Sequence, residues 1–208
     1  MASPDRERLR QTRAFFAGKA ATWDARFGDD MPAYAAAVAE AGLPAGALVA
    51  DIGCGTGRAL PALRAAVGST GVVLALDATP EMLSAAADRS SGCGAALIVA
   101  DAMRLPLADR ALDGIFAAGL LMHLPDPSLA LTELARVTGE PGVLILFHPS
   151  GRAALAARHG RELRPDDTLG CAVLTRLLTA TGWRLRSYDD AEHRFLAVAE
   201  RVGRAVAG

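Results

Sequence analysis

The sequence is poor in the residues that form metal sites, disulfide frameworks and nucleic-acid surfaces. Its three cysteines, Cys54, Cys93 and Cys171, are far apart and form no CxxC pair, so they predict neither a zinc site nor a disulfide framework. The four histidines lack the i, i+4 spacing of a metal-binding helix. Lys19 is the only lysine and the net charge is −1, so we expect no metal and no nucleic-acid partner.

Long apolar runs are also absent. Hydrophobic residues make up 51% of the 208-residue chain, but no uninterrupted run approaches the ~18 residues of a membrane-spanning helix. The first residues, MASPDRERLRQTR, are charged and contain no apolar signal-peptide core. We therefore expect a soluble cytoplasmic protein with no membrane partner. Scarce lysine beside abundant alanine and arginine indicates a GC-rich bacterial genome as its source.

Short apolar runs predict the strands of a parallel sheet. Five of them cover residues 47–53, 71–77, 95–101, 112–119 and 142–148. They are almost continuously apolar, as expected for parallel strands that are covered on both faces. The segments between them are long enough for crossover helices. Two further strands, at about 183–189 and 194–201, follow a helix predicted over about 168–181, so the pattern indicates one doubly wound α/β domain.

Several helix starts can be placed from the sequence. Thr79-Pro80-Glu81 and Asp126-Pro127 each combine a capping side chain with a proline in the first turn. Two amphipathic helices are predicted at about 4–16 and 30–41, joined by the linker GKAATWDARFGDD. These two helices form an N-terminal helical extension to the predicted sheet.

The clearest binding motif is the glycine loop DIGCGTG, residues 51–57, where the first strand ends and a helix begins. Its glycines allow a tight turn and a close approach of the backbone to a ligand. The free N–H groups at the start of the following helix suit an anionic group. A glycine-rich turn without a ligand is the alternative interpretation.

Asp77 ends the second strand, where an acid in nucleotide-binding folds accepts hydrogen bonds from ribose hydroxyls. Alone it could be an ordinary aspartate at a strand end, but with the glycine loop it predicts a nucleoside site. The dinucleotide pattern GxGxxG would need a glycine at position 58, which is Arg58 here. The spacing therefore disfavours NAD.

The motifs in this order resemble the class I S-adenosylmethionine-dependent methyltransferases, especially the small type-11 group. The matching segments are DIGCGTG, LALDATPEML, ADAMRLPLADRALDGIF and LLMHLPDPSLALTELARVTGEPGVLILF. The resemblance implies a Rossmann-like sheet of seven strands, mostly parallel with the last strand antiparallel. It divides the single domain into a helical extension (1–44), a cofactor-binding core (45–148) and an acceptor-side cap with the final helix and strands (149–208).

The resemblance also assigns site residues. The glycine loop would face the methionine portion of S-adenosylmethionine with Asp51 near its ammonium group, Asp77 would hold the ribose, and Asp101 with the Ala102 amide would bind adenine. Trp23 would cover the methionine end or form a buried aromatic plug. The full set expected at the cofactor is Trp23, Asp51, Gly53, Cys54, Gly55, Gly57, Asp77, Ala78, Met82, Asp101, Ala102, Ala118 and Gly119.

Two histidines are candidates for a catalytic base. His148 ends the fifth strand, at the edge where acceptors approach in this fold, or else it packs that strand end. His123 follows the fourth strand, where the family often has two histidines and this chain has Met122-His123. It could equally be structural.

The segment 150–167 is the predicted acceptor-side cap. Four of its residues could bind a carboxylate or phosphate, unless they form a solvated helix surface: Arg152, Arg158, Arg161 and Arg164. The predicted function is methyl transfer from S-adenosylmethionine to a small molecule, with S-adenosylhomocysteine as product. The sequence does not determine the oligomeric state, for which a homodimer is one option. The alternatives are a non-catalytic protein that binds this cofactor and a methyltransferase that acts on a macromolecule.

Overall fold

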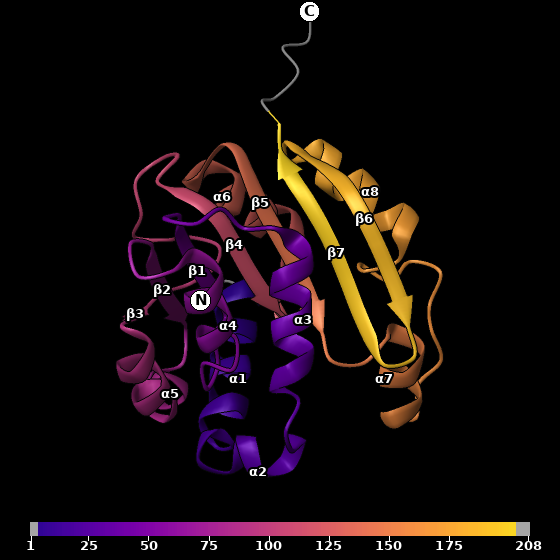
Figure 1. The fold of residues 1–208 in the computed structure, drawn as a ribbon. Helices are drawn as coiled ribbons and strands as arrows, with labels where there is room; N and C mark the ends of the chain where they lie inside the picture. Colours follow the sequence, from indigo (N-terminus) through magenta and orange to yellow (C-terminus); the bar gives the residue numbers. More distant parts are fainter. Residues whose placement is uncertain (1–3, 203–208) are drawn as a thin grey trace, which may run out of the picture.

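The computed structural model describes residues 4–202, with the side chains of residues 4–6 and of Phe27 left out. Its centre is a seven-stranded sheet in the order β3-β2-β1-β4-β5-β7-β6. The strands are β1 (Leu48–Ile52), β2 (Val72–Asp77), β3 (Ala96–Val99), β4 (Leu112–Ala118), β5 (Thr138–His148), β6 (Trp183–Ala191) and β7 (Arg194–Arg201). Figure 1 shows the strands side by side, with β3 at one edge of the sheet and β6 at the other.

The predicted fold class is confirmed. Strands β1 to β5 pair in parallel, and β7 runs antiparallel to both of its neighbours, β5 and β6. The strand order reverses between β1 and β4, which leaves a crevice at the carboxyl ends of these strands. This crevice is where ligands of open α/β sheets bind.

Helices bury an apolar face on each side of the sheet. One core includes Leu60 and Leu63 of α4 (Leu60–Val67), with α3 (Met31–Ala41) and α5 (Pro80–Cys93) on the same side. The other includes Leu131 and Leu134 of α6 (Pro127–Val137) and Leu174 of α8 (Cys171–Ala180). Because both faces are covered, the central strands carry apolar residues almost continuously, as their sequences predict.

Some boundaries differ from the sequence prediction. Strand β5 begins at Thr138, four residues before the predicted start, because Thr138 pairs with Leu112 ahead of an irregularity in the ladder. Helix α8 begins at Cys171, after Gly170 in an extended conformation, and not at 168. Thr79 precedes α5 as predicted, but its hydroxyl makes no capping bond, whereas the Asp126 carboxylate does accept the Leu129 N–H at 2.9 Å.

The N-terminal extension is more helical than the sequence suggests. Helix α1 (Pro4–Ala17) and α3 agree closely with the predicted helices, but the linker between them also folds into a 3₁₀ turn, η1 (Ala20–Thr22), and a short helix, α2 (Trp23–Phe27). The extension packs on α5 through α1 and η1. Figure 1 shows α1, α2 and α3 together on one side of the molecule.

Candidate active site

A cleft of about 620 Å³ lies at the carboxyl edge of the parallel strands. The ends of β1, β2 and β4 form its floor, while residues of α1, α2 and α7 (Arg152–Arg158) cover it from outside. The cleft brings together every residue predicted at the cofactor except Gly57. Those residues are Trp23, Asp51, Gly53, Cys54, Gly55, Asp77, Ala78, Met82, Asp101, Ala102, Ala118 and Gly119.

The glycine loop adopts a backbone shape that favours glycine. Gly53 and Gly55 have φ of 73° and 53°, in the left-handed region that other residues rarely adopt. A Cβ atom built on Gly55 would meet nothing within 4 Å, so this position opens into free space beside the cleft. A Cβ on Gly53 would lie 2.9 Å from Leu120 Cδ1, so that glycine also allows the loop after β4 to approach.

Gly57 has a different place from the other two glycines. It does not line the cleft, and a Cβ there would lie 2.8 Å from Leu60 Cδ1 and 3.3 Å from the Ala86 Cβ. Its φ of 78° also requires a left-handed backbone. The third glycine of the motif therefore serves the packing of α4 against α5.

Asp77 is held in place by backbone N–H groups. Its Oδ2 accepts the Gly55 N–H at 2.9 Å, and its Oδ1 accepts the Thr79 N–H at 2.8 Å. Burial raises the pKa of Asp77, while these bonds from Gly55 and Thr79 oppose the rise. The carboxylate thus links the glycine loop to the start of α5 and keeps lone pairs available to a ligand in the cleft.

Asp51 is the most deeply buried acid of the cleft, with 2% of its surface exposed. No described residue forms a hydrogen bond or ion pair with its carboxyl group. Burial raises the pKa of Asp51 to about 8, and the charge of Asp77 contributes to the rise. A buried acid that lacks a partner and faces a cleft is suited to a cationic ligand group, which would restore its ionised form.

We expect the Asp51→Asn variant without ligand to be more stable than wild type by about 4–5 kcal/mol at pH 7.5. The unfolded chain ionises at this position near pH 4, whereas the folded chain holds the proton to about pH 8. The folded state therefore loses stability as the pH rises between these values. Urea unfolding at pH 5 and 7.5 measures this: the difference between the proteins should fall to about 1–1.5 kcal/mol at pH 5. A variant that is less stable at both pH values would contradict the account.

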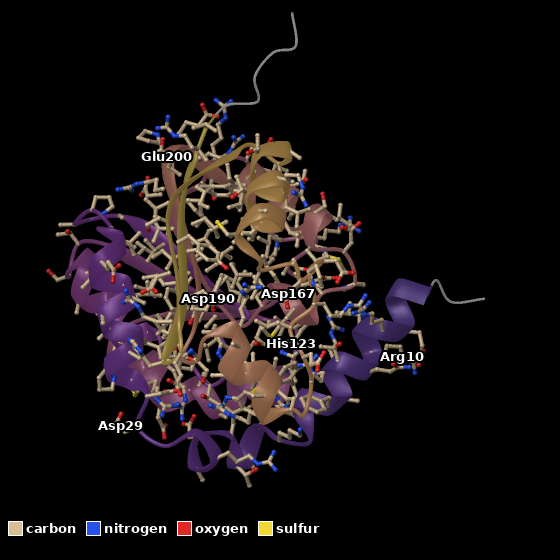
Figure 2. All side chains as sticks on the ribbon, turned by 90° about the vertical axis from the view of Figure 1, so that its right-hand side faces the viewer. Arg10, Asp29, His123, Asp167, Asp190 and Glu200 are labelled. Carbon is tan, nitrogen blue, oxygen red and sulfur yellow. The ribbon has the colours of Figure 1, made fainter. Side chains whose placement is uncertain are left out.

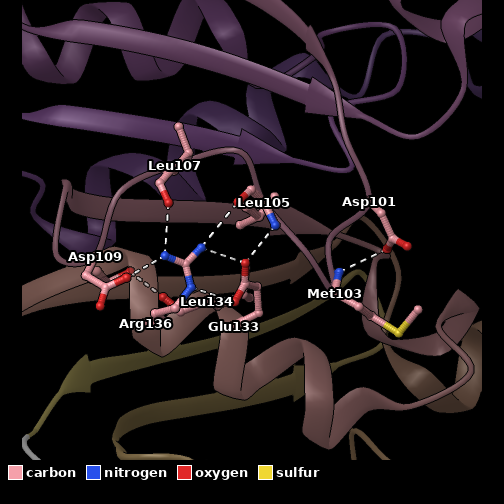
Figure 3. Close-up of polar contacts among 9 residues, drawn as sticks. Asp101, Met103, Leu105, Leu107, Asp109, Glu133, Leu134 and Arg136 are labelled. Atoms are coloured by element: carbon pink, nitrogen blue, oxygen red, sulfur yellow. Dashed lines mark hydrogen bonds and ion pairs between the residues drawn. The ribbon is translucent and has the colours of Figure 1, made fainter.

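The predicted adenine segment is anchored to α6. Asp101 Oδ1 accepts the Met103 N–H at 3.0 Å, and Glu133 of α6 accepts the Leu105 N–H at 2.7 Å. Arg136, also on α6, donates to the carbonyl oxygens of residues 105 and 107 and to the carboxylate of residue 109 (Figure 3). These bonds fix the loop 101–109, so Asp101 and the buried Ala102 keep their places at the cleft.

The N-terminal extension is attached to the glycine loop through Asp24. This carboxylate accepts the Thr56 hydroxyl at 2.7 Å and forms ion pairs with Arg58 at 3.1 Å and Arg89 at 2.6 Å. Arg58, which is 5% exposed, also pairs with Asp30 and donates to backbone oxygens of the linker. The sequence analysis used Arg58 only as evidence against NAD and did not identify Asp24, because the side-chain partners of Asp24 lie more than thirty positions away in the chain.

Replacing Arg58 with alanine should lower the free energy of unfolding by about 2–3 kcal/mol. The substitution leaves the largely buried Asp30 without its cation and removes one of the two cations of Asp24, which keeps Arg89. Partial exposure of Asp24 keeps the cost below that of a fully buried pair. Denaturant unfolding measures the loss, and Arg164→Ala is the control because its ion pair with Asp166 is exposed. Equal stability of the two variants would contradict a structural role for Arg58.

Aromatic side chains of the extension close the outer wall of the cleft. The Phe16 ring lies 5.5 Å from the Trp23 ring and meets the His123 ring edge-on at 5.0 Å. Trp23 is half-buried and lines the cleft. Figure 2 shows His123 beside α1. The contribution of α1 was not predicted, since an amphipathic helix does not reveal which surface its apolar face covers.

Both candidate histidines line the cleft. The Nδ1 atom of His148 lies 3.0 Å from the Ser150 nitrogen and 2.9 Å from the Ser150 oxygen, so either tautomer of the ring has a backbone partner. Burial lowers the pKa of His148, and the charge of Arg158 lowers it further. Desolvation lowers the pKa of His123, as does the nearby His148. Both imidazoles are therefore neutral at pH 7.

The four arginines of the predicted cap have different surroundings. Arg152 forms ion pairs with Asp190 at 2.9 Å and Asp167 at 3.3 Å, and Arg164 pairs with Asp166 on the exposed surface. Neither of them lines the cleft, whereas Arg158 and Arg161 do. Figure 2 shows Asp167 and Asp190 close together, as their shared contact with Arg152 requires.

Comparison with known proteins identifies this arrangement. Residues 50–146, which contain the glycine loop, Asp77 and Asp101, match the family model described as a methyltransferase domain. The matched segment of the chain is therefore similar to a methyltransferase domain. A methyltransferase of the same fold has been solved with bound S-adenosylmethionine, and this cleft is the candidate site for that cofactor.

Two curated relatives match parts of this chain. Methyltransferase GfsG of Streptomyces halstedii is 34% identical over 163 residues, which cover 76% of this chain and 53% of the relative. Demethylmenaquinone methyltransferase of Staphylococcus aureus is 34% identical over 110 residues, which cover 52% of this chain and 46% of the relative. The chain thus spans about half the length of these relatives.

A solved structure supports the fold along nearly the whole chain. Magnesium protoporphyrin IX methyltransferase (ChlM) from Synechocystis PCC 6803, with bound S-adenosylmethionine, superposes with a TM-score of 0.70. The match covers 97% of this chain and 99% of that chain at 19% identity. Within residues 4–202, no helix combines the length and the apolar character that crossing a bilayer requires.

Proposed function

We propose that this protein transfers the methyl group of S-adenosylmethionine to a small-molecule acceptor. The observation that carries the proposal is the buried pair of acids at one sheet edge. Asp77 is fixed by the Gly55 and Thr79 N–H groups, and Asp51 lies unpartnered beside it. One acid suits the hydroxyls of a ribose and the other suits an ammonium group, and S-adenosylmethionine carries both.

The chain's own residues would bind, orient and cover the reactants. Asp77 would accept the ribose hydroxyls, Asp51 would pair with the ammonium group, and Asp101 with the Ala102 amide would bind the adenine. The bound cofactor supplies a methyl group that its sulfonium has already activated. The protein therefore has to align an acceptor and exclude water, and alignment supplies up to ~7–11 kcal/mol in well-oriented model reactions. Phe16 and Trp23, which cover the cleft from outside, are placed to exclude water.

We propose His148 as the base for an oxygen acceptor. Nε2 can accept a proton from the acceptor only in the tautomer whose proton is on Nδ1. The Ser150 carbonyl, 2.9 Å from Nδ1, can accept a hydrogen bond from this N–H group and so favours that tautomer. The His148→Asn variant should lower kcat about tenfold, less than the ~10²–10⁴ typical of general bases, because alignment remains. Affinity for S-adenosylhomocysteine should not change. His159→Asn is the control on the same cleft; an equal loss of kcat in both variants would argue against His148 as the base.

The proposal also covers the acceptor, the division of the chain, its source, its location and its oligomeric state. A small-molecule acceptor agrees with the relative named demethylmenaquinone methyltransferase and with the absence of a basic excess in the chain. We also propose the division into extension, cofactor core and acceptor cap, although residues 1–3 and 203–208 lie outside the described part. A bacterial source, a cytoplasmic location and a homodimer complete the proposal, and sedimentation of the purified protein tests the dimer.

Methyl transfer itself is tested with labelled cofactor. Incubation with S-adenosylmethionine labelled on its methyl group and a panel of phenols, amines and carboxylic acids should move the label to at least one acceptor. Asp77→Ala should abolish that transfer, whereas Asp113→Ala, at the opposite end of the sheet, should retain it. Tight binding of the cofactor without transfer to any acceptor, small or macromolecular, would instead indicate a binding protein that lacks the chemistry.

A further inference from the structure

The acidic and the basic residues that line the cleft come from different parts of the fold. Its acids lie mainly at the strand ends. Asp51 is in β1, Asp77 ends β2 and Asp101 follows β3 by two residues. The cations come from the covering elements, namely Arg13, Lys19, Arg26, Arg58, Arg158 and Arg161. The acids belong to the cofactor half of the cleft. The outer half is therefore electropositive, although the whole chain has a net charge of −1.

Most of these cations have no carboxylate partner among the described residues. Arg58 is neutralised by Asp24 and Asp30, and Lys19 lies over the Phe15 ring at 3.3 Å. The other four guanidinium groups form no ion pair within residues 4–202. Arg13 even has a buried Nε atom without a hydrogen-bond partner. Unpaired guanidinium groups that line a cleft are suited to anionic ligands.

The cofactor alone does not account for this number of cations. S-adenosylmethionine carries one carboxylate, and Arg13 and Arg26 lie in the N-terminal extension on either side of Trp23, which is expected at the methionine end. Arg158 and Arg161 lie instead on α7 and just after it, beyond the end of β5. These two residues, which we call the cap arginines, are left for a second ligand.

The cap arginines are placed beside the reactive edge of the sheet. Arg158 Nη2 donates to the Ser150 hydroxyl at 3.0 Å, and the backbone of this buried serine contacts His148. Leu155, three residues before Arg158, also lines the cleft, so α7 presents an apolar side chain and a cation on one face. Arg152 and its acid partners hold this segment against β6.

We propose that the methyl acceptor carries an oxyanion, a carboxylate or a phosphate, which binds Arg158 and Arg161. The apolar body of the acceptor lies against Leu155 and the ring of Phe16. This inference rests on the proposed function, since it assigns the acceptor half of the same cleft. A guanidinium group binds either anion through two parallel N–H···O bonds. The anion would orient the acceptor with its nucleophile toward His148.

Equilibrium titration of the S-adenosylhomocysteine complex with benzoate, phenyl phosphate and neutral benzamide tests the inference. At least one of the two anions should bind ten times more tightly than benzamide, and the preferred anion identifies the group. Arg158→Gln and Arg161→Gln should each weaken that anion about tenfold, as expected for loss of a charged hydrogen bond. Arg164→Gln is the matched control, because Arg164 lies in the same segment but outside the cleft. All variants should bind S-adenosylhomocysteine as wild type does.

Each other outcome has a definite meaning. Equal affinity for benzamide and both anions, absence of anion binding to the complex, or equal losses in Arg158→Gln and Arg164→Gln would overturn the anionic acceptor and leave the proposed function standing. Failure of the wild-type protein to bind S-adenosylhomocysteine would overturn the proposed function, and the acceptor assignment with it.

Discussion

Replacing Asp77 with alanine should weaken the binding of S-adenosylmethionine by at least tenfold, and by about 10²-fold if both ribose hydroxyls are lost. A hydrogen bond to a charged group contributes about 1.5–3 kcal/mol. The substitution also removes the acceptor of the Gly55 and Thr79 N–H groups, which hold the glycine loop against α5. The loss therefore combines missing ligand contacts with a less ordered loop. Isothermal titration with S-adenosylmethionine and S-adenosylhomocysteine measures it.

Asp113→Ala is the matched control for Asp77→Ala. Asp113 also accepts a backbone N–H, that of Leu48 at 2.8 Å, but at the other end of β1 and outside the cleft. Its removal should leave cofactor affinity unchanged. Unchanged affinity in Asp77→Ala, with a folded protein, would refute the ribose role of this acid.

Cofactor affinity should rise about tenfold per pH unit between pH 5.5 and 7.5, so about hundredfold across this window. The pKa of Asp51 lies at about 8 in the free protein. Below that pH, Asp51 must lose its proton before it can pair with the ammonium group, and this requirement becomes more costly as the pH falls. Titration calorimetry in buffers of different ionisation enthalpy should also detect the release of about one proton on binding.

The Asp51→Asn variant identifies the group responsible. It should bind the cofactor weakly and with little dependence on pH, because asparagine has no proton to lose. Asp77 is the other acid of the pair. Any pH dependence of cofactor affinity that remains in Asp51→Asn therefore reports the titration of Asp77. Burial lowers the pKa of His148 and of His123, which moves the titration of both imidazoles toward the acid end of this window. A wild-type affinity that does not change between pH 5.5 and 7.5 would contradict the role of Asp51.

The sequence was most informative where a function depends on residues close together in the chain. The glycine loop, Asp77 and Asp101 each follow a strand, and parallel strands bring their carboxyl ends to one edge. Continuous apolar runs located the five parallel strands, and the last two strands also lie where they were predicted. Only Gly57 lies away from the cleft to which it was assigned, because a glycine pattern does not distinguish a ligand contact from close packing of helices.

What the sequence did not predict depends on contacts between distant residues. Arg152, Arg158, Arg161 and Arg164 are equivalent in a sequence pattern, but Asp190 of β6 pairs with Arg152 only after the sheet has formed. In the same way, Arg58 has no distinguishing neighbours in the sequence until α2 places Asp24 beside it. The partner of a charged side chain thus requires the tertiary structure, whereas the place of a strand end does not.

Titration of the purified protein with S-adenosylhomocysteine at pH 7.5 tests the central claim most directly, because it requires no knowledge of the acceptor. We expect saturable binding at one site per chain, weakened at least tenfold in Asp77→Ala and unchanged in Asp113→Ala. Absence of binding in the folded wild-type protein, or equal binding by both variants, would contradict the assignment of this cleft as the cofactor site.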